Sequence, residues 1–597
     1  MYLKPCRGNI LVVALILIVV VSGFVAAALN STSNSSRQTD RSRDYVAAQA
    51  AAEGALEYGF AIWKRRIIEQ NRAITTAEAN SDLTQPGFPG FAYASTAERG
   101  PLRIDALDEY GAPVATPKPV TIEVINYPGW RGRTYSYQAR AKVRQAPAQY
   151  NLRAGVKRGF QYSEVPLFQT MFFFEDNLEF YKPASMIISG LVHTNSFAYI
   201  SGQDGVPLTF LDGVSYAKGY SHSSDPPFSD MWSGWTPNAT RSPVYPDGIA
   251  EQVRQVPRFE PLGNEPASVL NTTDVNPNND SMRELIEPPN SSYPDPVELS
   301  ARRLYNKAGI VVKVNGPLVT VTTQNGTTLN AARKTDIIQT VVERTTIYDQ
   351  REGKNVDVAT VDVAKLTDTL RKGGVSNFNS VIYVHDTTPV TALDPEPKSI
   401  RLKNGGVLPD GGLSVVSENP IYIQGDYNTG ATTNPALVPS NEGGNPNNTD
   451  APTLTGYTRK PAAVIGDAVM FLSNSWNDAN AALPVTDRAA THTTYNTAIV
   501  SGFMPSGYQP PSGAQYGYSG GANNFPRFLE NWTDDSCTYF GSMVELYQSK
   551  TFTGAWDTGV IFRPPLRRWN FDENFRSTPP PGSLDAVIWS RGTWAKY

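Results

Sequence analysis

The chain has 597 residues, of which 40% are hydrophobic and 18% are charged. This content of apolar and aromatic residues excludes a disordered chain. The 52 Lys and Arg against 56 Asp and Glu lack the basic excess that is typical of nucleic-acid binders. Two cysteines exclude a disulfide scaffold. The length predicts roughly four domains, or fewer if one of them is an extended β architecture.

Residues 10–29 form an apolar run without a charge. A helix of this length spans about 30 Å, the thickness of one hydrocarbon core. Lys4 and Arg7 precede the run, and the first charge after it is Arg37. Positive charge before a span favours an N-terminus in the cytoplasm and the rest of the chain outside. The predicted membrane helix includes the apolar residues Ile10, Leu11, Val12, Val13, Leu15, Ile16, Leu17, Ile18, Phe24 and Leu29.

A second helical signal follows over residues 41–69, which are rich in Ala, Glu and Arg. Its apolar residues recur every three or four positions, as in one stripe of an amphipathic helix. They are Tyr45, Ala48, Ala52, Leu56, Phe60, Trp63 and Ile67. The stripe predicts packing either on the protein's own globular part or on a neighbouring subunit. Residues 30–40, rich in Ser, Thr and Asn, are predicted to be flexible or to break the helix.

This N-terminal arrangement resembles that of type IV pilin-like proteins. The shared features are a short basic leader that ends in Arg7-Gly8, an apolar helix and the Ala-rich stretch AAQAAAEGALEYG. The sequence is most similar to PilX-type minor pilins and to the large K-type pseudopilin of type II secretion. The resemblance implies cleavage by prepilin peptidase after Gly8, with Asn9 as the new N-terminus. Its further implications are a bacterial inner-membrane location, later incorporation into a periplasmic or extracellular filament, and other pilins as partners.

One position departs from the major pilins. They carry Glu at the fifth mature position, where this sequence has Val13. In a filament that carboxylate is thought to meet the N-terminal amine of an adjoining subunit within lipid, where an unpaired charge is costly. The resemblance therefore implies a minor or tip-located subunit rather than a shaft subunit.

Two other targeting hypotheses remain open. Ala26-Ala27-Ala28 fits the A-x-A site of a secretory signal peptide, whose removal would release a soluble protein that begins at Leu29. Alternatively, the apolar helix stays uncut as a plain anchor.

The rest of the sequence predicts strands and turns. Residues 119–160 alternate apolar and polar residues, which predicts a small antiparallel sheet like the one that packs on a pilin helix. From about residue 165, short β-rich runs recur beside Gly190, Gly425, Gly466 and Gly502. This pattern favours a β-solenoid over a β-sandwich whose strands merely share a composition. Several runs between 165 and 597 also resemble an uncharacterised exported domain that often follows PilX-type N-termini.

The expected fold is therefore mainly β with one long N-terminal helix. The predicted order is a leader over 1–8, a transmembrane and pilin-like helix over 9–75, and a small sheet over 76–164. There follow a first solenoid part with a Pro/Asn-rich insertion over 165–300, a mixed α/β insertion over 301–405, and an aromatic-rich second solenoid part over 406–597. Within the insertion, residues 361–373 are predicted to form a short helix with Leu366 and Leu370 on its apolar face.

The candidate chemistry is sparse. Asp274, Asn276, Asn278 and Asp280 have the alternating spacing of a calcium loop, but the Gly and the final Glu of an EF-hand are missing. A solvated loop is the competing interpretation. Calcium is the one cofactor that the sequence suggests.

Two further motifs partly match catalytic patterns, but a turn is the favoured interpretation of both. Residues 517–521 match the G-x-S-x-G pattern around Ser519, but no histidine follows, as a hydrolase would require. His385-Asp386 lies at the end of a predicted strand, and Cys537 is expected to be a buried thiol.

The sequence predicts a structural protein without a catalytic site. Its expected role is that of a minor pilin or pseudopilin in filament assembly or adhesion, with membrane lipid, prepilin peptidase, other filament subunits and a surface or glycan ligand as partners. The alternative is an exported enzyme that acts on polysaccharide, or a carbohydrate-binding protein, on a β-helix scaffold. Such a scaffold alone does not establish a function.

Overall fold

The computed structural model describes residues 10–147, 152–222, 239–392, 394–430, 456–507, 518–557 and 559–597. The chain divides into two compact units. The helix unit comprises residues 1–120, 134–162 and 589–597. The β unit comprises residues 121–133 and 163–588. The β unit is thus inserted, along the chain, between parts of the helix unit.

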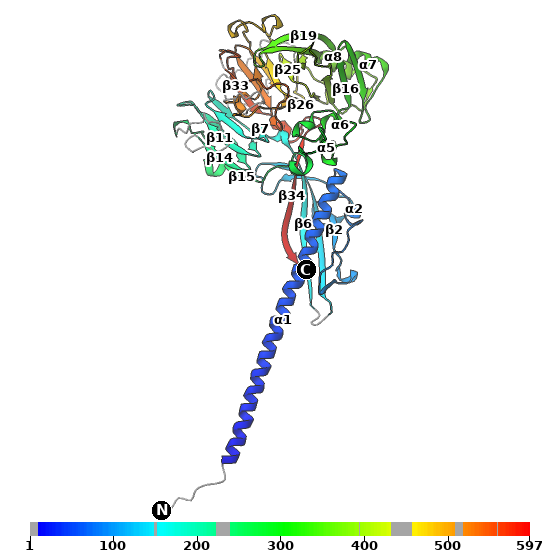
Figure 1. Cartoon of the computed structure of the whole chain (residues 1–597), viewed down its shortest axis with the longest axis vertical. Coiled ribbons are helices and arrows are strands. Elements are labelled where there is room, and N and C mark those ends of the chain that lie inside the picture. The colour runs from blue at the N-terminus through cyan, green and yellow to red at the C-terminus, as the bar shows by residue number, and fades with distance from the viewer. Residues whose placement is uncertain are drawn as a thin grey trace, which may run out of the picture. The chain divides into compact units, whose positions relative to one another are not determined.

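Helix α1 (Ile10–Gln70) runs for 61 residues without interruption (Figure 1). The expected break over residues 30–40 is therefore wrong. Ser and Thr compete with a helix when their hydroxyls bond the backbone elsewhere, but here they bond the helix itself. Thr32 Oγ1 donates to the Ala28 carbonyl at 2.8 Å, and Thr39 Oγ1 donates to the Ser35 carbonyl at 2.9 Å. Helix α2 (Thr76–Asn80) follows, with Thr75 as its N-cap.

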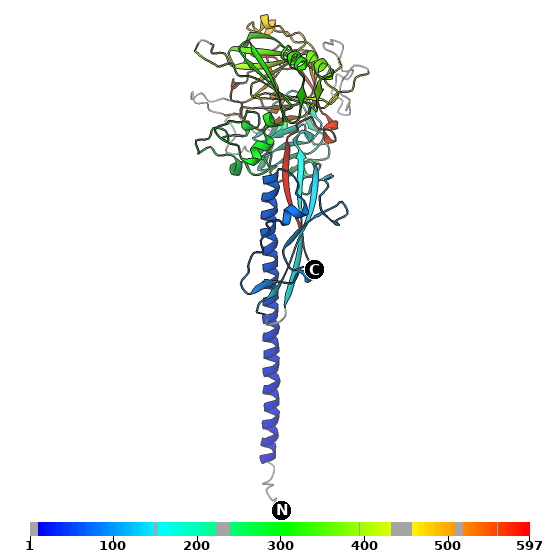
Figure 2. The same cartoon turned by 90° about the vertical axis from the view of Figure 1, so that its right-hand side faces the viewer.

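A seven-stranded sheet, most of whose residues belong to the helix unit, accompanies α1. Its long strands run beside the helix in Figure 2. Its strand order is β3 (Pro113–Val114), β2 (Arg103–Leu107), β5 (Arg131–Gln145), β6 (Arg153–Pro166) and β34 (Asp585–Lys596). Strands β1 (Phe91–Tyr93) and β4 (Val120–Glu123) also pair with β5. Strands β1 and β2 run antiparallel to β5. Residues 119–160, for which we expected a small antiparallel sheet, contribute β4, β5 and part of β6 to this sheet. The last strand comes from the C-terminal end of the chain, a pairing that the sequence did not predict.

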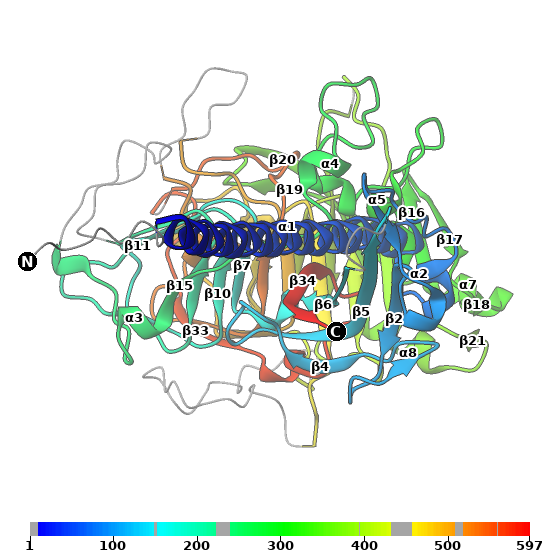
Figure 3. The ribbon, with the colours of Figure 1, turned by 90° about the horizontal axis from the view of Figure 1, so that it is seen from below.

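The largest sheet of the β unit has 11 strands. In spatial order they are β15 (Val253–Gln255), β13 (Val214–Tyr216), β10 (Val192–Thr194), β7 (Phe172–Phe174), β32 (Met543–Glu545), β29 (Ala498–Ser501), β26 (Ala462–Gly466), β24 (Leu413–Val416), β22 (Val381–Asp386), β16 (Ile310–Asn315) and β17 (Leu318–Thr323). Every neighbouring pair is parallel except β16 and β17, which form an antiparallel hairpin. Strands β15, β10, β7, β16 and β17 of this sheet are labelled in Figure 3.

Two further sheets of the β unit are mostly or wholly parallel. One contains β19 (Val341–Asp349), β20 (Lys354–Asp362), β23 (Lys398–Lys403), β25 (Ile421–Gln424), β27 (Val469–Leu472) and β30 (Arg527–Phe528), with only β19 and β20 antiparallel. The other contains β28 (Thr493–Asn496), β31 (Ser536–Gly541) and β33 (Leu566–Phe571). The chain visits the three sheets in turn, because β26, β27 and β28 are followed by β29, β30 and β31.

The remaining elements are short. Strands β8 (Leu178–Tyr181), β11 (Phe197–Ser201) and β14 (Gly219–His222) form a parallel sheet, β9 (Met186–Ile188) pairs with β12 (Leu208–Phe210), and β18 (Thr328–Leu329) pairs with β21 (Val375–Ser376). The helices are α3 (Ile249–Gln252), α4 (Pro266–Val269), α5 (Val297–Arg302), α6 (Leu304–Lys307), α7 (Ala331–Ile338) and α8 (Val363–Arg371). Helix α8 confirms the helix expected within residues 361–373, and Leu366 is buried.

Candidate functional site

The first part of α1 exposes apolar side chains on every side. Among its large apolar residues from Leu11 to Leu29, the exposed fraction ranges from 48% for Val20 to 77% for Leu11. An 18-residue window of the helix has a mean hydropathy of 3.0, and none of this window is buried. By its length and composition, α1 is therefore apolar enough to cross a membrane. Apolar surface of this extent is costly in water, and lipid or another apolar surface would cover it.

The later part of the same helix is packed. The buried side chains from Ala48 to Ile67 lie on one stripe: Ala48, Ala51, Ala52, Ala55, Leu56, Phe60, Trp63 and Ile67. Small residues bring the helix close to its neighbours, since a Cβ added at Gly59 would lie 3.2 Å from Leu102 Cδ1. The Trp63 ring centroid lies 5.1 Å from that of Tyr137 on β5. Of the two packing alternatives, the stripe therefore lies against the protein's own unit.

The two parts of α1 are joined by a polar segment over residues 30–44, whose side chains are mostly exposed. At 1.5 Å per residue it adds about 22 Å of helix between the apolar and the packed parts. The arrangement can hold a folded unit away from a membrane surface or from the axis of an assembly of helices.

The processing residues Gly8 and Asn9 lie outside the described residues. Val13 has an exposed fraction of 59% within the apolar part of α1.

The loop considered for calcium binds its own backbone. Asp274 Oδ1 accepts from the Asn276 amide at 2.8 Å, and Asn276 Oδ1 accepts from the Asn278 amide at 2.9 Å. Asn278 Oδ1 in turn accepts from the Asn290 amide at 3.1 Å. In the described part of the chain, no group of three or more His, Cys, Asp and Glu residues could hold a metal ion.

The two motifs considered for catalysis have local partners. Ser519 Oγ accepts from the Gly521 amide at 3.2 Å, whereas Gly517 of the same motif lies outside the described residues. His385 Nδ1 lies 3.0 Å from Glu418 Oε1, while Asp386 forms an ion pair with Arg344. The adjacent His385 and Asp386 therefore face different partners. Burial raises the pKa of Cys537 to about 12, so this thiol stays neutral at physiological pH.

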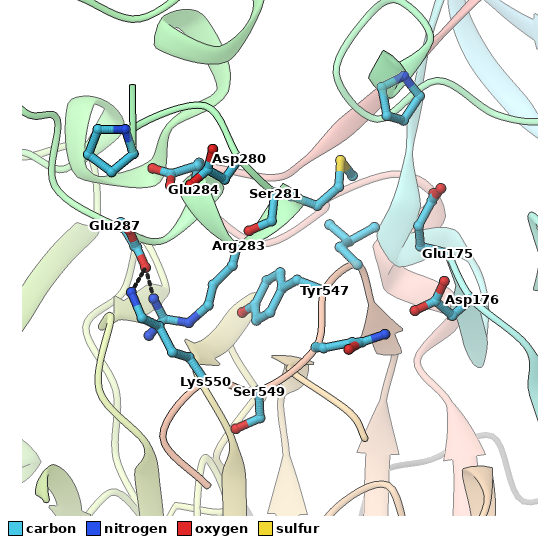
Figure 4. A pocket seen from close by; sticks show the side chains of 15 residues that line it. Glu175, Asp176, Asp280, Ser281, Arg283, Glu284, Glu287, Tyr547, Ser549 and Lys550 are labelled. Carbon is cyan, nitrogen blue, oxygen red and sulfur yellow. Dashed lines mark ion pairs between the residues drawn. The ribbon is translucent and has the colours of Figure 1, made fainter. Parts of the chain in front are cut away.

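A cavity of about 550 Å³ in the β unit gathers several carboxylates (Figure 4). They are Glu175, Asp176, Asp280, Glu284 and Glu287. Three of them are ion-paired: Glu175 with Arg258, Glu284 with Arg303, and Glu287 with Arg283 and Lys550.

Charge compensation limits what these carboxylates can do. Burial is the largest influence on Glu175, Asp176 and Glu284, and it raises the pKa of each. A glycosidase needs one carboxyl as proton donor and a second as base or nucleophile. Arginines on three of the five groups reduce the number that could take such roles. This cavity could not be predicted from the sequence, because its residues come from four separate stretches of the chain.

Comparisons with known proteins give little. No protein-family model matches the sequence, and no curated protein matches it. Among solved structures, the chain is similar to the competence-associated pilin ComZ from Thermus thermophilus. The identity is 9% and the TM-score is 0.27, over 93% of this chain and 97% of that chain.

Proposed function

We propose that this protein is a pilin-like structural subunit of a membrane-assembled filament. The division of α1 carries the proposal: one unbroken helix has an exposed apolar first part and a later part packed on a sheet. An apolar helix that is exposed on all sides fits a lipid bilayer before assembly and a bundle of similar helices after it. The packed part fixes the folded units to that helix.

The finer assignment is a minor pilin or pseudopilin of the PilX or K type, in a type IV pilus or a type II secretion-like filament. Val13 supports it, because a subunit without a carboxylate there cannot pair with the N-terminal amine of a neighbour. Its partners would be inner-membrane lipid, prepilin peptidase and the other filament subunits. The N-terminus would lie in the cytoplasm and both folded units outside.

The β unit is proposed to be a β-solenoid that serves as cargo for display or adhesion at the filament tip. Parallel pairing supports this, since strands from successive passes of the chain lie in register, as Val464 with Ile499 and Thr494 with Thr538. We propose that the β unit is not an enzyme. A surface or glycan ligand would bind to it without being transformed, and calcium is not required by the proposal.

The mass of the mature N-terminal peptide tests the targeting proposal. We expect Asn9 as the first residue, and we expect Gly8→Phe to leave an unprocessed, membrane-held chain. Ala28→Leu is the matched control, because it blocks an A-x-A signal cleavage and leaves Gly8 intact. A mature chain that begins at Leu29 and loses this processing in the Ala28→Leu variant would overturn the proposal. So would an uncut chain that begins at Met1.

A further inference from the structure

The last strand of the chain belongs to the sheet of the helix unit. Strand β34 neighbours β6, although β6 ends at Pro166 and β34 begins at Asp585. Residues 589–597 belong to the helix unit, whereas nearly everything between the two strands belongs to the β unit. The sheet that holds α1 is therefore completed only by residues that follow the β unit along the chain.

Trp589 closes the aromatic cluster around α1. Its ring centroid lies 5.6 Å from that of Trp63 in an edge-to-face arrangement, and 5.2 Å from that of Tyr162 on β6. Lys64 Nζ lies 5.3 Å from the Trp589 ring centroid. Edge-to-face ring pairs and cation–π contacts add to the energy of apolar burial. The first residue of the returning segment thus covers the largest buried side chain of the helix.

Arg591 holds the helix by charge and by stacking. Its Nη1 donates to Glu57 Oε2 at 2.7 Å, and its guanidinium carbon lies 4.1 Å from the Phe60 ring centroid. Arg158 on β6 donates from Nη1 to Glu57 Oε1 at 2.6 Å and from Nε to the Gly592 carbonyl at 2.8 Å. A single helix carboxylate is therefore shared by an arginine from β34 and an arginine from β6.

The contacts continue to the C-terminus. Lys596 Nζ lies 5.4 Å from the Tyr45 ring centroid, and the Tyr597 hydroxyl donates to the Arg99 carbonyl at 2.8 Å. From Tyr45 to Lys64, the C-terminal segment touches about 28 Å of helix at 1.5 Å per residue. These contacts cover most of the packed part of α1 and do not reach its apolar part.

We propose that residues 589–597 are a latch that holds the packed part of α1 only in a chain completed through the β unit. A chain that ends or misfolds within the β unit would lack the latch, and residues 45–67 of α1 would be poorly held. The consequence for filament assembly, selection of complete subunits, rests on the proposed function. The latch itself rests only on the contacts above.

Hydrogen–deuterium exchange of the whole protein in detergent micelles tests the latch without a filament. We expect deletion of residues 589–597 to lower amide protection over residues 45–67 by about tenfold or more, while protection of β26 and β29 stays unchanged. The Trp589→Ala/Arg591→Ala double variant should give a smaller loss in the same segment. Thr593→Ala, at an exposed position of the same strand, is the matched control and should match the wild type.

A peptide rescue separates a missing latch from general misfolding. A synthetic peptide of residues 585–597, added to the deleted chain, should restore protection over residues 45–67, and the same peptide with both alanines should not. Unchanged protection in the deleted chain would overturn the proposal. Equal loss of protection throughout the β unit, or failure of the wild-type peptide to restore protection, would overturn it as well. Because no filament is measured, these outcomes are independent of the N-terminal processing test.

Discussion

The two units keep charged groups in different places. In the helix unit, apolar and aromatic side chains hold α1, and ion pairs such as Arg591 with Glu57 lie at the rim, with side-chain exposures of 44% and 42%. The β unit also buries both partners of some ion pairs: Arg303 is 0% exposed and pairs with Glu284 and Asp295, whose side chains are each 4% exposed. The net charges also differ, because the helix unit has 20 Lys and Arg against 11 Asp and Glu in a chain with 52 and 56.

This difference shows two ways to stabilise a fold. The helix unit depends on close apolar contact with the packed part of α1, whereas the large apolar side chains from Leu11 to Leu29 are exposed among the described residues. The β unit stacks short parallel strands, and buried ion pairs and hydrogen bonds satisfy the polar groups at their turns. Breaking a buried pair by removing one partner is strongly destabilising, which makes the β unit sensitive to charge.

Truncation of Trp63 should give the largest effect. Trp63→Ala removes a fully buried ring from the helix unit, and we expect it to lower the free energy of unfolding of that unit by about 3–5 kcal/mol. Phe24→Ala, in the apolar part of the same helix, is the control and should change it by less than about 0.5 kcal/mol. Denaturant titration in detergent, followed by tryptophan fluorescence, measures both. Equal effects of the two variants would contradict the division of α1.

The free energy of unfolding of the β unit should depend on pH through the buried carboxyl of Glu530. Glu530 accepts from the Ser473 amide at 2.7 Å and from its hydroxyl at 2.6 Å, and burial raises the pKa of Glu530 from 4.5 to about 8. At pH values between 4.5 and 8, the folded state therefore binds more protons than the unfolded state. The free energy of unfolding of the β unit should therefore fall as pH rises from about 4.5 to 8, with a slope approaching about 1.4 kcal/mol per pH unit.

Glu530→Gln should flatten that slope, because the amide does not titrate. Glu69→Gln, at an exposed position near the end of α1, is the matched control and should leave the slope unchanged. Thermal unfolding at a series of pH values provides the measurement. A slope in the Glu530→Gln variant equal to that of the wild type would assign the pH dependence to other groups.

Local patterns predicted the local elements. A short window of sequence is enough to predict three of them. These are the uncharged run over residues 10–29, the apolar stripe up to Ile67 and the helix around Leu366. The continuity of α1 over residues 30–40 could not be predicted from propensity, and in the structure the hydroxyls of Thr32 and Thr39 bond carbonyls of the preceding turn. In that segment composition is a weak guide to structure.

Pairings between strands that are far apart in the chain could not be predicted from the sequence. Residues 585–596 form a strand in the structure, but nothing in their sequence specifies β6 as a neighbour more than 400 residues away. The same holds for the carboxylates around the 550 Å³ cavity, which the topology brings together. In the candidate site, the exposed apolar part of α1 was predictable, whereas the latch that holds its packed part was not.

Site-specific photocrosslinking along α1 tests the central claim most directly. A crosslinker at Leu17, in the apolar part of α1, should capture another filament subunit when the protein is purified with assembled fibres from the producing cell. A crosslinker at Tyr110, which is 87% exposed on the helix unit, serves as the comparison and should capture far less. Recovery of the Leu17-labelled protein as a free, uncrosslinked species that never enters a fibre would contradict the account.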